Sequence, residues 1–234
     1  MTKPVEAVNN QTIRIAGADA RVLTEADLLQ LTCGATGCSS TCCKATAPIV
    51  LNPYELARIC KAARMSYEDL LDVLDTDRAK GFPLVMLPRD PVCHFWTATG
   101  CRIYEARPLA CRLFPLGRVY ENNRSHIVLP EVNRCSGLVP TPAKTVTAYL
   151  QEQDTALFIE MADRWIEFVS HIERLPLQDA PVTSVAFHML VYSPDTPPNP
   201  GQSEEAVSVE EGFLLRLSTA KEQLPRFLKL QGQV

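Results

Sequence analysis

The alternation of hydrophobic and polar residues predicts several short strands in the first 130 residues. Residues 11–23 alternate on either side of Gly17, which is typical of a hairpin. Residues 49–51 and 82–87 are short apolar runs that favour strands. Residues 118–128 alternate around two consecutive asparagines, and this pattern predicts a second hairpin.

Capping signals in the same region predict three helices. Thr24, with Asp27 three residues later, predicts a helix that continues through the leucines of 28–31. An Asn-Pro pair predicts the start of a helix over 52–64, and Ser66 is a candidate cap for the next one.

The last 95 residues or so are predicted to be mainly helical. A long helix is expected over 142–173, residues 179–192 fit strand or helix, 193–202 form a Pro-rich linker, and 208–223 predict a final helix. Apolar residues recur at helical spacing along the long helix, which indicates core packing: Leu150, Leu157, Met161, Trp165, Phe168 and Ile172.

Composition excludes several classes of protein. The formal charge of -4 argues against nucleic acid as a partner, because phosphate binding needs clustered Lys and Arg. No apolar run is long enough for a signal-peptide core or a membrane span. We therefore expect a cytoplasmic protein that is neither exported nor bound to a membrane.

Nine cysteines in such a compartment indicate metal or redox chemistry, since disulfides are rare there. One of them, Cys60, lies on the apolar face of a predicted helix and is expected to be a buried structural residue. The other eight form two groups and are the candidate metal ligands: Cys33, Cys38, Cys42 and Cys43, then Cys93, Cys101, Cys111 and Cys135.

Thiolates are soft ligands that select an iron–sulfur cluster or zinc over magnesium or calcium. Cys42 and Cys43 are neighbours, and in an extended segment their side chains would point to opposite sides, which is awkward for one tetrahedral ion. Two metals, a multi-iron cluster, or one ligand with one supporting thiol fit the pair more easily. A vicinal disulfide would strain the peptide. His94, beside Cys93, is an alternative nitrogen ligand for a mixed zinc site.

Basic residues adjoin many of these thiols. Four thiolates around zinc or a four-iron cluster leave about two negative charges, which neighbouring cations can offset; ordinary surface charge is an equal alternative. Pro108 favours a short helix that places Cys111 in its first turn, where a thiolate is stabilised. The basic neighbours are Lys44, Arg102, Arg112 and Arg134.

The segment Gly100–Pro115, Gly-Cys-Arg-Ile-Tyr-Glu-Ala-Arg-Pro-Leu-Ala-Cys-Arg-Leu-Phe-Pro, closely resembles the YkgJ-like cysteine-cluster family. Together with the Cys42-Cys43 doublet and Cys135-Ser136-Gly137, the likeness covers about residues 33–137. The resemblance implies a bacterial cytoplasmic protein that chelates zinc or iron. The chain departs from the family in having four residues between Cys33 and Cys38, where two are usual, and in Ser136, where Pro is common.

We therefore predict an α+β fold: a small, loop-rich, metal-centred core with short strands, covered by a long helix and a C-terminal helical segment. Residues 1–139 would form the cysteine-cluster domain and 140–234 a helical extension packed on it.

Three functions remain open at this stage. The first is an iron–sulfur or zinc protein with a structural, redox or metal-handling role. The second is an enzyme, because one branch of the family resembles flagellin lysine N-methylases, although none of the ten glycines forms a Gly-x-Gly cofactor loop. The third is a metal-delivery factor that recognises a protein partner through the segment after Ser193.

Overall fold

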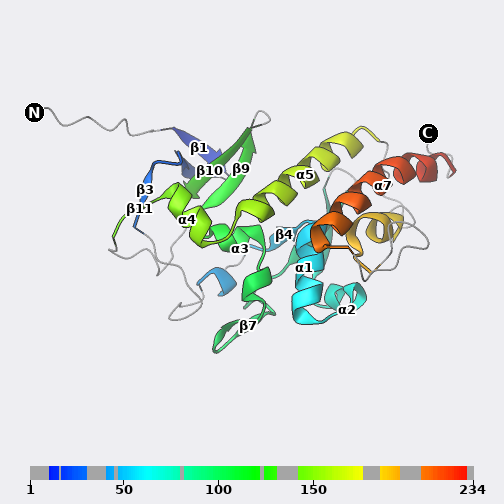
Figure 1. Cartoon of the computed structure of the whole chain (residues 1–234), viewed down its shortest axis with the longest axis horizontal. Coiled ribbons are helices and arrows are strands. Elements are labelled where there is room, and N and C mark those ends of the chain that lie inside the picture. The colour runs from blue at the N-terminus through cyan, green and yellow to red at the C-terminus, as the bar shows by residue number, and fades with distance from the viewer. Residues whose placement is uncertain are drawn as a thin grey trace, which may run out of the picture. The chain divides into compact units, whose positions relative to one another are not determined.

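A computed structural model of the chain describes residues 11–15, 17–30, 41–44, 47–79, 82–121, 124–130, 142–175, 185–195 and 207–230 (Figure 1). It contains both helices and strands, which confirms the predicted α+β class. The chain forms two compact units, each made of two stretches: residues 1–42 with 109–156, and residues 43–108 with 157–234. We call them unit 1 and unit 2. The predicted domain division at 139/140 stays a prediction.

Unit 1 contains a four-stranded antiparallel sheet in the order β1-β2-β10-β9. Its strands are β1 (Thr12–Ile15), β2 (Ala18–Leu23), β9 (Gly117–Glu121) and β10 (Arg124–Pro130). Gly17 has a positive φ of 86° at the β1–β2 turn, a conformation that favours glycine. Ala20, Val22 and Val128 form the apolar face. Both predicted hairpins are confirmed, while the two asparagines lie outside the described residues.

The predicted helix after Thr24 is wrong. The capping contact forms, since Asp27 Oδ2 accepts from the Thr24 backbone N–H at 2.6 Å. However, residues 25–26 make only a turn, and Leu28–Leu29 form strand β3, which pairs with β11 (Lys144–Thr145). The carbonyls of Glu25 and Asp27 accept from the N–H groups of Thr147 and Val146, so the backbone groups that would continue a helix are used elsewhere.

The prediction of a single long helix over 142–173 is also wrong. This part of the chain forms two helices, α4 (Val146–Glu152) and α5 (Ala156–Ile172). Between them Asp154 has a positive φ of 50°, so the α-helical path ends there. A buried arginine described below bonds to the carbonyls at this break, which the hydrophobic periodicity could not reveal.

Unit 2 contains a three-stranded antiparallel sheet in the order β4-β6-β5. Strands β4 (Ile49–Leu51) and β6 (Phe82–Leu87) confirm the predictions, and β5 (Asp75–Ala79) was not anticipated.

The predicted caps in unit 2 are also confirmed. Asn52 and Glu55 form a capping box at the start of α1 (Pro53–Ala63), and Ser66 with Asp69 caps α2 (Tyr67–Leu71). Arg64 ends α1 in the left-handed conformation.

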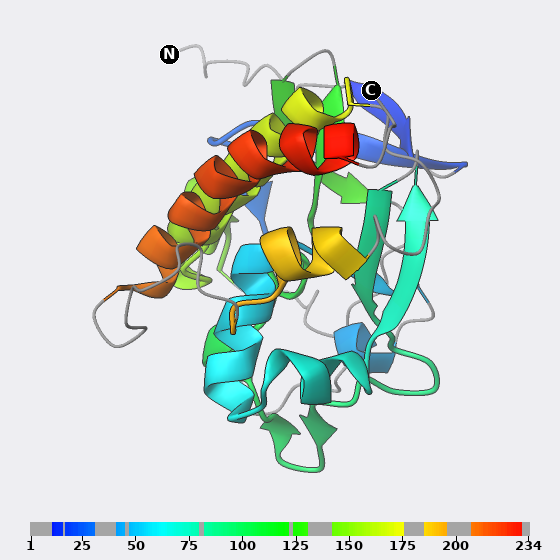
Figure 2. The same cartoon turned by 90° about the vertical axis from the view of Figure 1, so that its right-hand side faces the viewer.

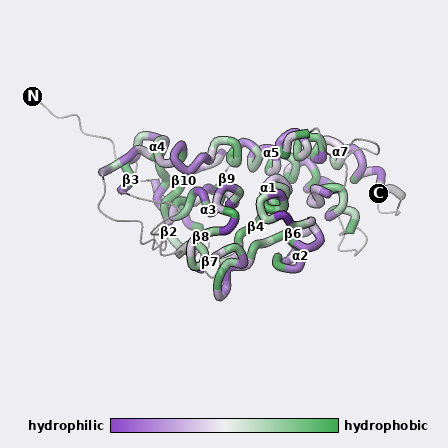
Figure 3. Tube along the Cα trace, turned by 60° about the horizontal axis from the view of Figure 1, so that its bottom comes forward, coloured by the Kyte–Doolittle hydropathy of each residue, from purple (hydrophilic) through white to green (hydrophobic). Residues whose placement is uncertain are grey.

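The C-terminal part of unit 2 is helical. Figure 2 shows α1, the π-helical segment η3 (His188–Tyr192) and α7 (Val209–Leu230) next to one another. The ambiguous segment near residue 192 is thus helical where it is described, and the predicted final helix is confirmed. Green hydrophobic positions and purple hydrophilic ones both recur along α5 and α7 in Figure 3, as expected of helices with one buried face.

Within the described residues, no helix combines the length and apolar character that crossing a bilayer requires.

Candidate metal centre

Cys42 and Cys43 lie in η1 (Thr41–Lys44), a single turn of 3₁₀-helix, rather than in the extended segment considered above. Both are partly exposed. With three residues per turn, successive side chains in this helix diverge by about 120°. The two thiols of the doublet therefore point in different directions, as the sequence argument required, although the backbone conformation differs.

In unit 2, a backbone hydrogen bond joins one cysteine of the first group to one cysteine of the second. The N–H of Cys93 donates to the carbonyl of Cys43 at 2.7 Å. These residues are 50 positions apart in the sequence. The fold thus brings one member of the first group next to one member of the second.

Cys101 reaches the same neighbourhood through a short hairpin formed by β7 (Trp96–Thr97) and β8 (Gly100–Cys101). Trp96 is the cross-strand partner of Cys101, and its N–H donates to the Cys93 carbonyl at 3.0 Å. Gly100 has a φ of 126°, which favours glycine at this turn. Backbone contacts therefore link Cys43, Cys93 and Cys101 through Trp96.

Two of the predicted basic neighbours lie over aromatic rings in this region. The Lys44 ammonium is 4.9 Å from the centre of the Trp96 ring, and the Arg102 guanidinium is 5.6 Å from that of Phe95. His94 is exposed, and its Nε2 lies 3.4 Å from Arg102 Nη2. Its role as a metal ligand stays a prediction.

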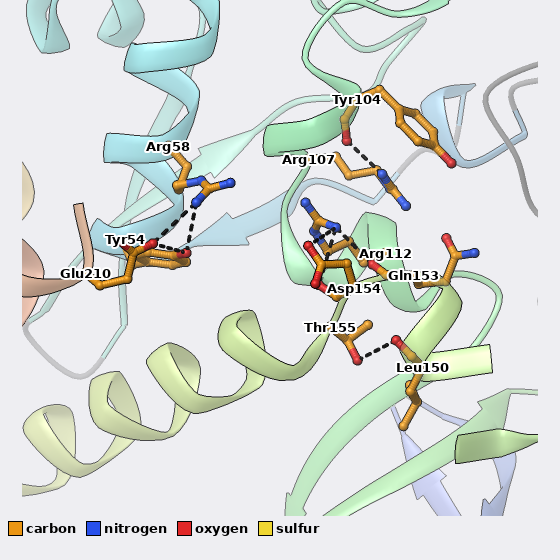
Figure 4. Close-up of polar contacts among 10 residues, drawn as sticks. All are labelled: Tyr54, Arg58, Tyr104, Arg107, Arg112, Leu150, Gln153, Asp154, Thr155 and Glu210. Atoms are coloured by element: carbon orange, nitrogen blue, oxygen red, sulfur yellow. Dashed lines mark hydrogen bonds and ion pairs between the residues drawn. The ribbon is translucent and has the colours of Figure 1, made fainter. Parts of the chain in front are cut away.

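The residues between Cys101 and Cys111 in the family motif are largely buried. Ile103 and Ala106 are each 2% exposed, and the buried Arg107 donates to the Tyr104 carbonyl at 2.7 Å while its guanidinium lies over the Tyr104 ring (Figure 4). Here the rare residue types of the motif stabilise the chain path. The distinctive residues of the motif therefore serve packing as well as the predicted metal chemistry.

In unit 1, Cys111 is partly exposed and lies in the short helix α3 (Leu109–Leu113), as the Arg-Pro sequence predicted. The neighbouring Arg112 is 1% exposed, so it is not a solvated surface charge. Its Nη1 donates to the Gln153 carbonyl at 2.9 Å and lies 3.9 Å from an Asp154 carboxylate oxygen (Figure 4). Arg112 thus caps the end of α4.

Cys60 is a buried residue of α1, as predicted. Burial, followed by the negative charge of Asp195, raises the pKa of the Cys60 thiol to about 12. The thiol is therefore protonated at neutral pH, which is unfavourable for a metal ligand.

The described residues supply only part of the predicted ligand set. Cys33, Cys38, Cys135 and the basic Arg134 lie outside them. Among the residues that are described, no three His, Cys, Asp or Glu side chains are grouped so as to hold a metal ion. The donor chemistry nevertheless fits a soft metal, since the described candidate ligands are cysteine thiols.

Trp96 is the site residue that sequence reasoning missed. Its position within Cys-His-Phe-Trp, three residues after a candidate ligand, was the available signal. Its Nε1 is buried and has no hydrogen-bond partner among the residues that the structure describes. An unmatched buried donor next to Cys93 and Cys101 along the backbone fits an additional acceptor at this place.

Cysteines from distant parts of the chain, held on short strands and turns, are typical of small metal-binding domains. Comparison with known families agrees with this class. Residues 32–132 match a model of the CxxCxxCC family, described as a "putative zinc- or iron-chelating domain", and this match confirms the resemblance noted in the sequence. Searches of curated proteins and of solved structures gave no match to the chain.

Proposed function

We propose that this chain is an iron–sulfur protein whose cluster is bound by cysteine thiolates. The observation that best supports this proposal is the backbone network that joins Cys43, Cys93 and Cys101 at Trp96. The proposed ligands are drawn from Cys33, Cys38, Cys42, Cys43, Cys93, Cys101, Cys111 and Cys135.

The choice of a cluster over a single zinc ion is based on Cys42 and Cys43. Because the side chains of a 3₁₀ turn diverge, two adjacent thiolates serve a cluster with several irons more easily than one tetrahedral ion. The ammonium of Lys44 also adds positive charge beside the doublet, which favours the negative charge of a thiolate-bound cluster.

The role that follows is electron transfer or metal handling in a reducing compartment, for which we infer the bacterial cytoplasm. Metal binding would also link loops that contain little apolar bulk, so part of the binding free energy would stabilise the fold.

The proposal is tested by purifying the full chain without oxygen. Iron and acid-labile sulfide should both be present, with broad visible absorption from thiolate-to-iron charge transfer and a paramagnetic signal in one oxidation state. A colourless protein that contains stoichiometric zinc would rule out the cluster and establish the zinc alternative.

A further inference from the structure

Trp96 has a buried hydrogen-bond donor that the rest of the described chain does not satisfy. Of the buried side-chain nitrogen and oxygen atoms in the described residues, its Nε1 is the one without a hydrogen-bond partner. An indole N–H can only donate, and burying it without an acceptor is unfavourable. Such an atom in a folded protein therefore indicates an acceptor that the described residues do not supply.

The surroundings of Trp96 identify the chemistry of that acceptor. Cys101 is its cross-strand partner, and directly opposite residues of an antiparallel pair have their side chains on the same face. Cys93 accepts the Trp96 backbone N–H, and it also donates its own N–H to Cys43. Strand pairing and backbone hydrogen bonds thus connect Trp96 to Cys101 and Cys93, and Cys93 to Cys43.

Lys44 adds a constraint on the orientation of the indole. Its ammonium lies over the ring, 4.9 Å from the centre, so a cation occupies the face of the ring while the N–H projects from the edge. The electropositive edge and the ammonium both favour negative charge nearby. Sulfur that carries negative charge, as a metal-bound thiolate or a bridging sulfide, matches both features.

We infer that the Trp96 Nε1–H donates a hydrogen bond to a negatively charged sulfur of the metal centre. This inference rests on the proposed function and adds Trp96 as a positioning residue that tunes the centre without binding metal itself. Hydrogen bonds to cluster sulfurs stabilise the more reduced, more negative state, so they raise the reduction potential.

The test compares the full-length wild type with Trp96→Phe and Trp165→Phe, each reconstituted without oxygen using ferrous iron and sulfide. Phenylalanine retains an aromatic ring beneath Lys44 and removes the N–H. Trp165 is the matched control, because it is the second of the two tryptophans and packs on Phe168 in α5, with ring centres 5.5 Å apart. Metal per chain, reduction potential and the two indole ¹⁵N–H resonances are measured.

All three proteins should bind the same amount of iron, and Trp96→Phe alone should have a more negative potential. The Trp96 indole resonance, assigned by its absence in Trp96→Phe, should change on loading much more than that of Trp165. An unchanged potential in Trp96→Phe at equal iron content, or an unaffected Trp96 resonance, would overturn the inference while leaving the proposed function intact.

Loading with zinc separates the two proposals further. If the chain takes up zinc and no iron, the iron–sulfur proposal fails, but a change of the Trp96 indole resonance on zinc binding would still establish donation to a metal-bound thiolate. If Trp96→Phe fails to fold, the Trp96 resonance of Trp165→Phe provides the same test in a folded protein.

Discussion

Cys60 and Cys93 are both mostly buried, but we propose different roles for them. Cys60 is a buried residue of α1, and burial raises the pKa of its thiol to about 12, whereas Cys93 contacts Cys43 through the backbone. A thiol that stays protonated packs as a small apolar group, and a metal ligand must lose its proton. Burial alone therefore does not distinguish the two kinds of cysteine, but the neighbours do.

This difference predicts the outcome of a matched pair of variants. Cys93→Ser should weaken metal binding by at least about tenfold, since losing even a supporting contact to a metal ligand has effects of this size. Cys60→Ala should retain the wild-type metal content and lose about 1 kcal/mol of stability. Metal per chain after dialysis against a chelator, together with denaturant unfolding, measures both effects. Equal metal content in the two variants would contradict the assignment.

His188 is partly buried and lies beside two buried tyrosines in unit 2. Its Nδ1 lies 2.8 Å from the Tyr67 hydroxyl, and its ring is 5.4 Å from that of Tyr192. Burial, with a smaller contribution from the positive charge of Arg78, lowers the pKa of His188 below its usual 6.5. The neutral imidazole is therefore the form that the folded protein favours.

The sign of the resulting pH dependence follows from proton uptake. Below about pH 6.5 the unfolded chain binds a proton at this histidine before the folded chain does, so the free energy of unfolding should fall as the pH drops from 7.5 towards 5. This contribution is fully present above pH 6.5. Histidine NMR should give an apparent pKa below 6.5 for His188. In His188→Asn, the free energy of unfolding should depend less on pH over this range. An apparent pKa at or above 6.5 would show that the assignment is wrong.

At the level of the elements, the break between α4 and α5 depends on Arg112. The guanidinium is buried and donates to the carbonyl of Gln153, while Asp154 provides the left-handed residue. A helix end that is not exposed to water needs such a donor for its last carbonyls. The forked guanidinium of Arg112 suits this role, because it reaches the carbonyls of both Gln153 and Asp154.

Arg112→Met should destabilise the protein by about 1–3 kcal/mol, because it retains much of the side-chain volume but leaves buried carbonyls unsatisfied. Asp154→Asn is the control. It preserves a residue type that tolerates positive φ and removes only a carboxylate that is 85% exposed, so a change within about 0.5 kcal/mol is expected. Denaturant unfolding of both variants measures the difference. Equal losses would mean that the ion pair, not the carbonyl bonds, stabilises the break.

Local sequence predicted the elements that have strong local signals. The Asn52 cap, the hairpin around Gly17 and the strand at Ile49–Leu51 are examples. The prediction failed at Thr24, where the cap formed but the carbonyls of Glu25 and Asp27 bonded to the start of α4 instead. A contact more than 100 residues away in the chain overrode the local propensity, and single-sequence patterns do not contain that information.

The sequence predicted the ligand chemistry of the candidate site better than it predicted the positions of its residues. Clustered cysteines predicted metal binding from residue type and an expected reducing compartment, and the family match supports this prediction. The link between Cys43 and Cys93, and the position of Trp96 opposite Cys101, arise from strand pairing and a backbone hydrogen bond. Arg112 was identified as a neighbour of Cys111, but its burial against the end of α4 required the fold.

At the scale of the whole molecule, the family match does not coincide with a unit that packs by itself. It ends at residue 132, yet α1, which lies within it, packs against helices from beyond that residue. The Tyr54 ring contacts Phe158 of α5 and Phe213 of α7, and its hydroxyl donates to Glu210 at 2.9 Å (Figure 4). The core around α1 is therefore incomplete without the C-terminal helices.

Two neighbouring residues of α7 test this dependence. Phe213 is 3% exposed and Leu214 is 40% exposed. Truncation to alanine at these adjacent positions therefore compares a core side chain with a surface side chain. Phe213→Ala should cost about 3–5 kcal/mol in unfolding free energy, because it removes a buried ring from beside Tyr54. Leu214→Ala should cost about 1 kcal/mol or less.

Metal retention during thermal unfolding extends the test to function. Because bound metal stabilises only the folded state, a core that opens at lower temperature should release metal at lower temperature. Phe213→Ala should therefore lose its metal before the wild type does, and Leu214→Ala should follow the wild type. If Phe213→Ala unfolds early but retains its metal to the wild-type temperature, the metal centre would be stable independently of the packing of α7.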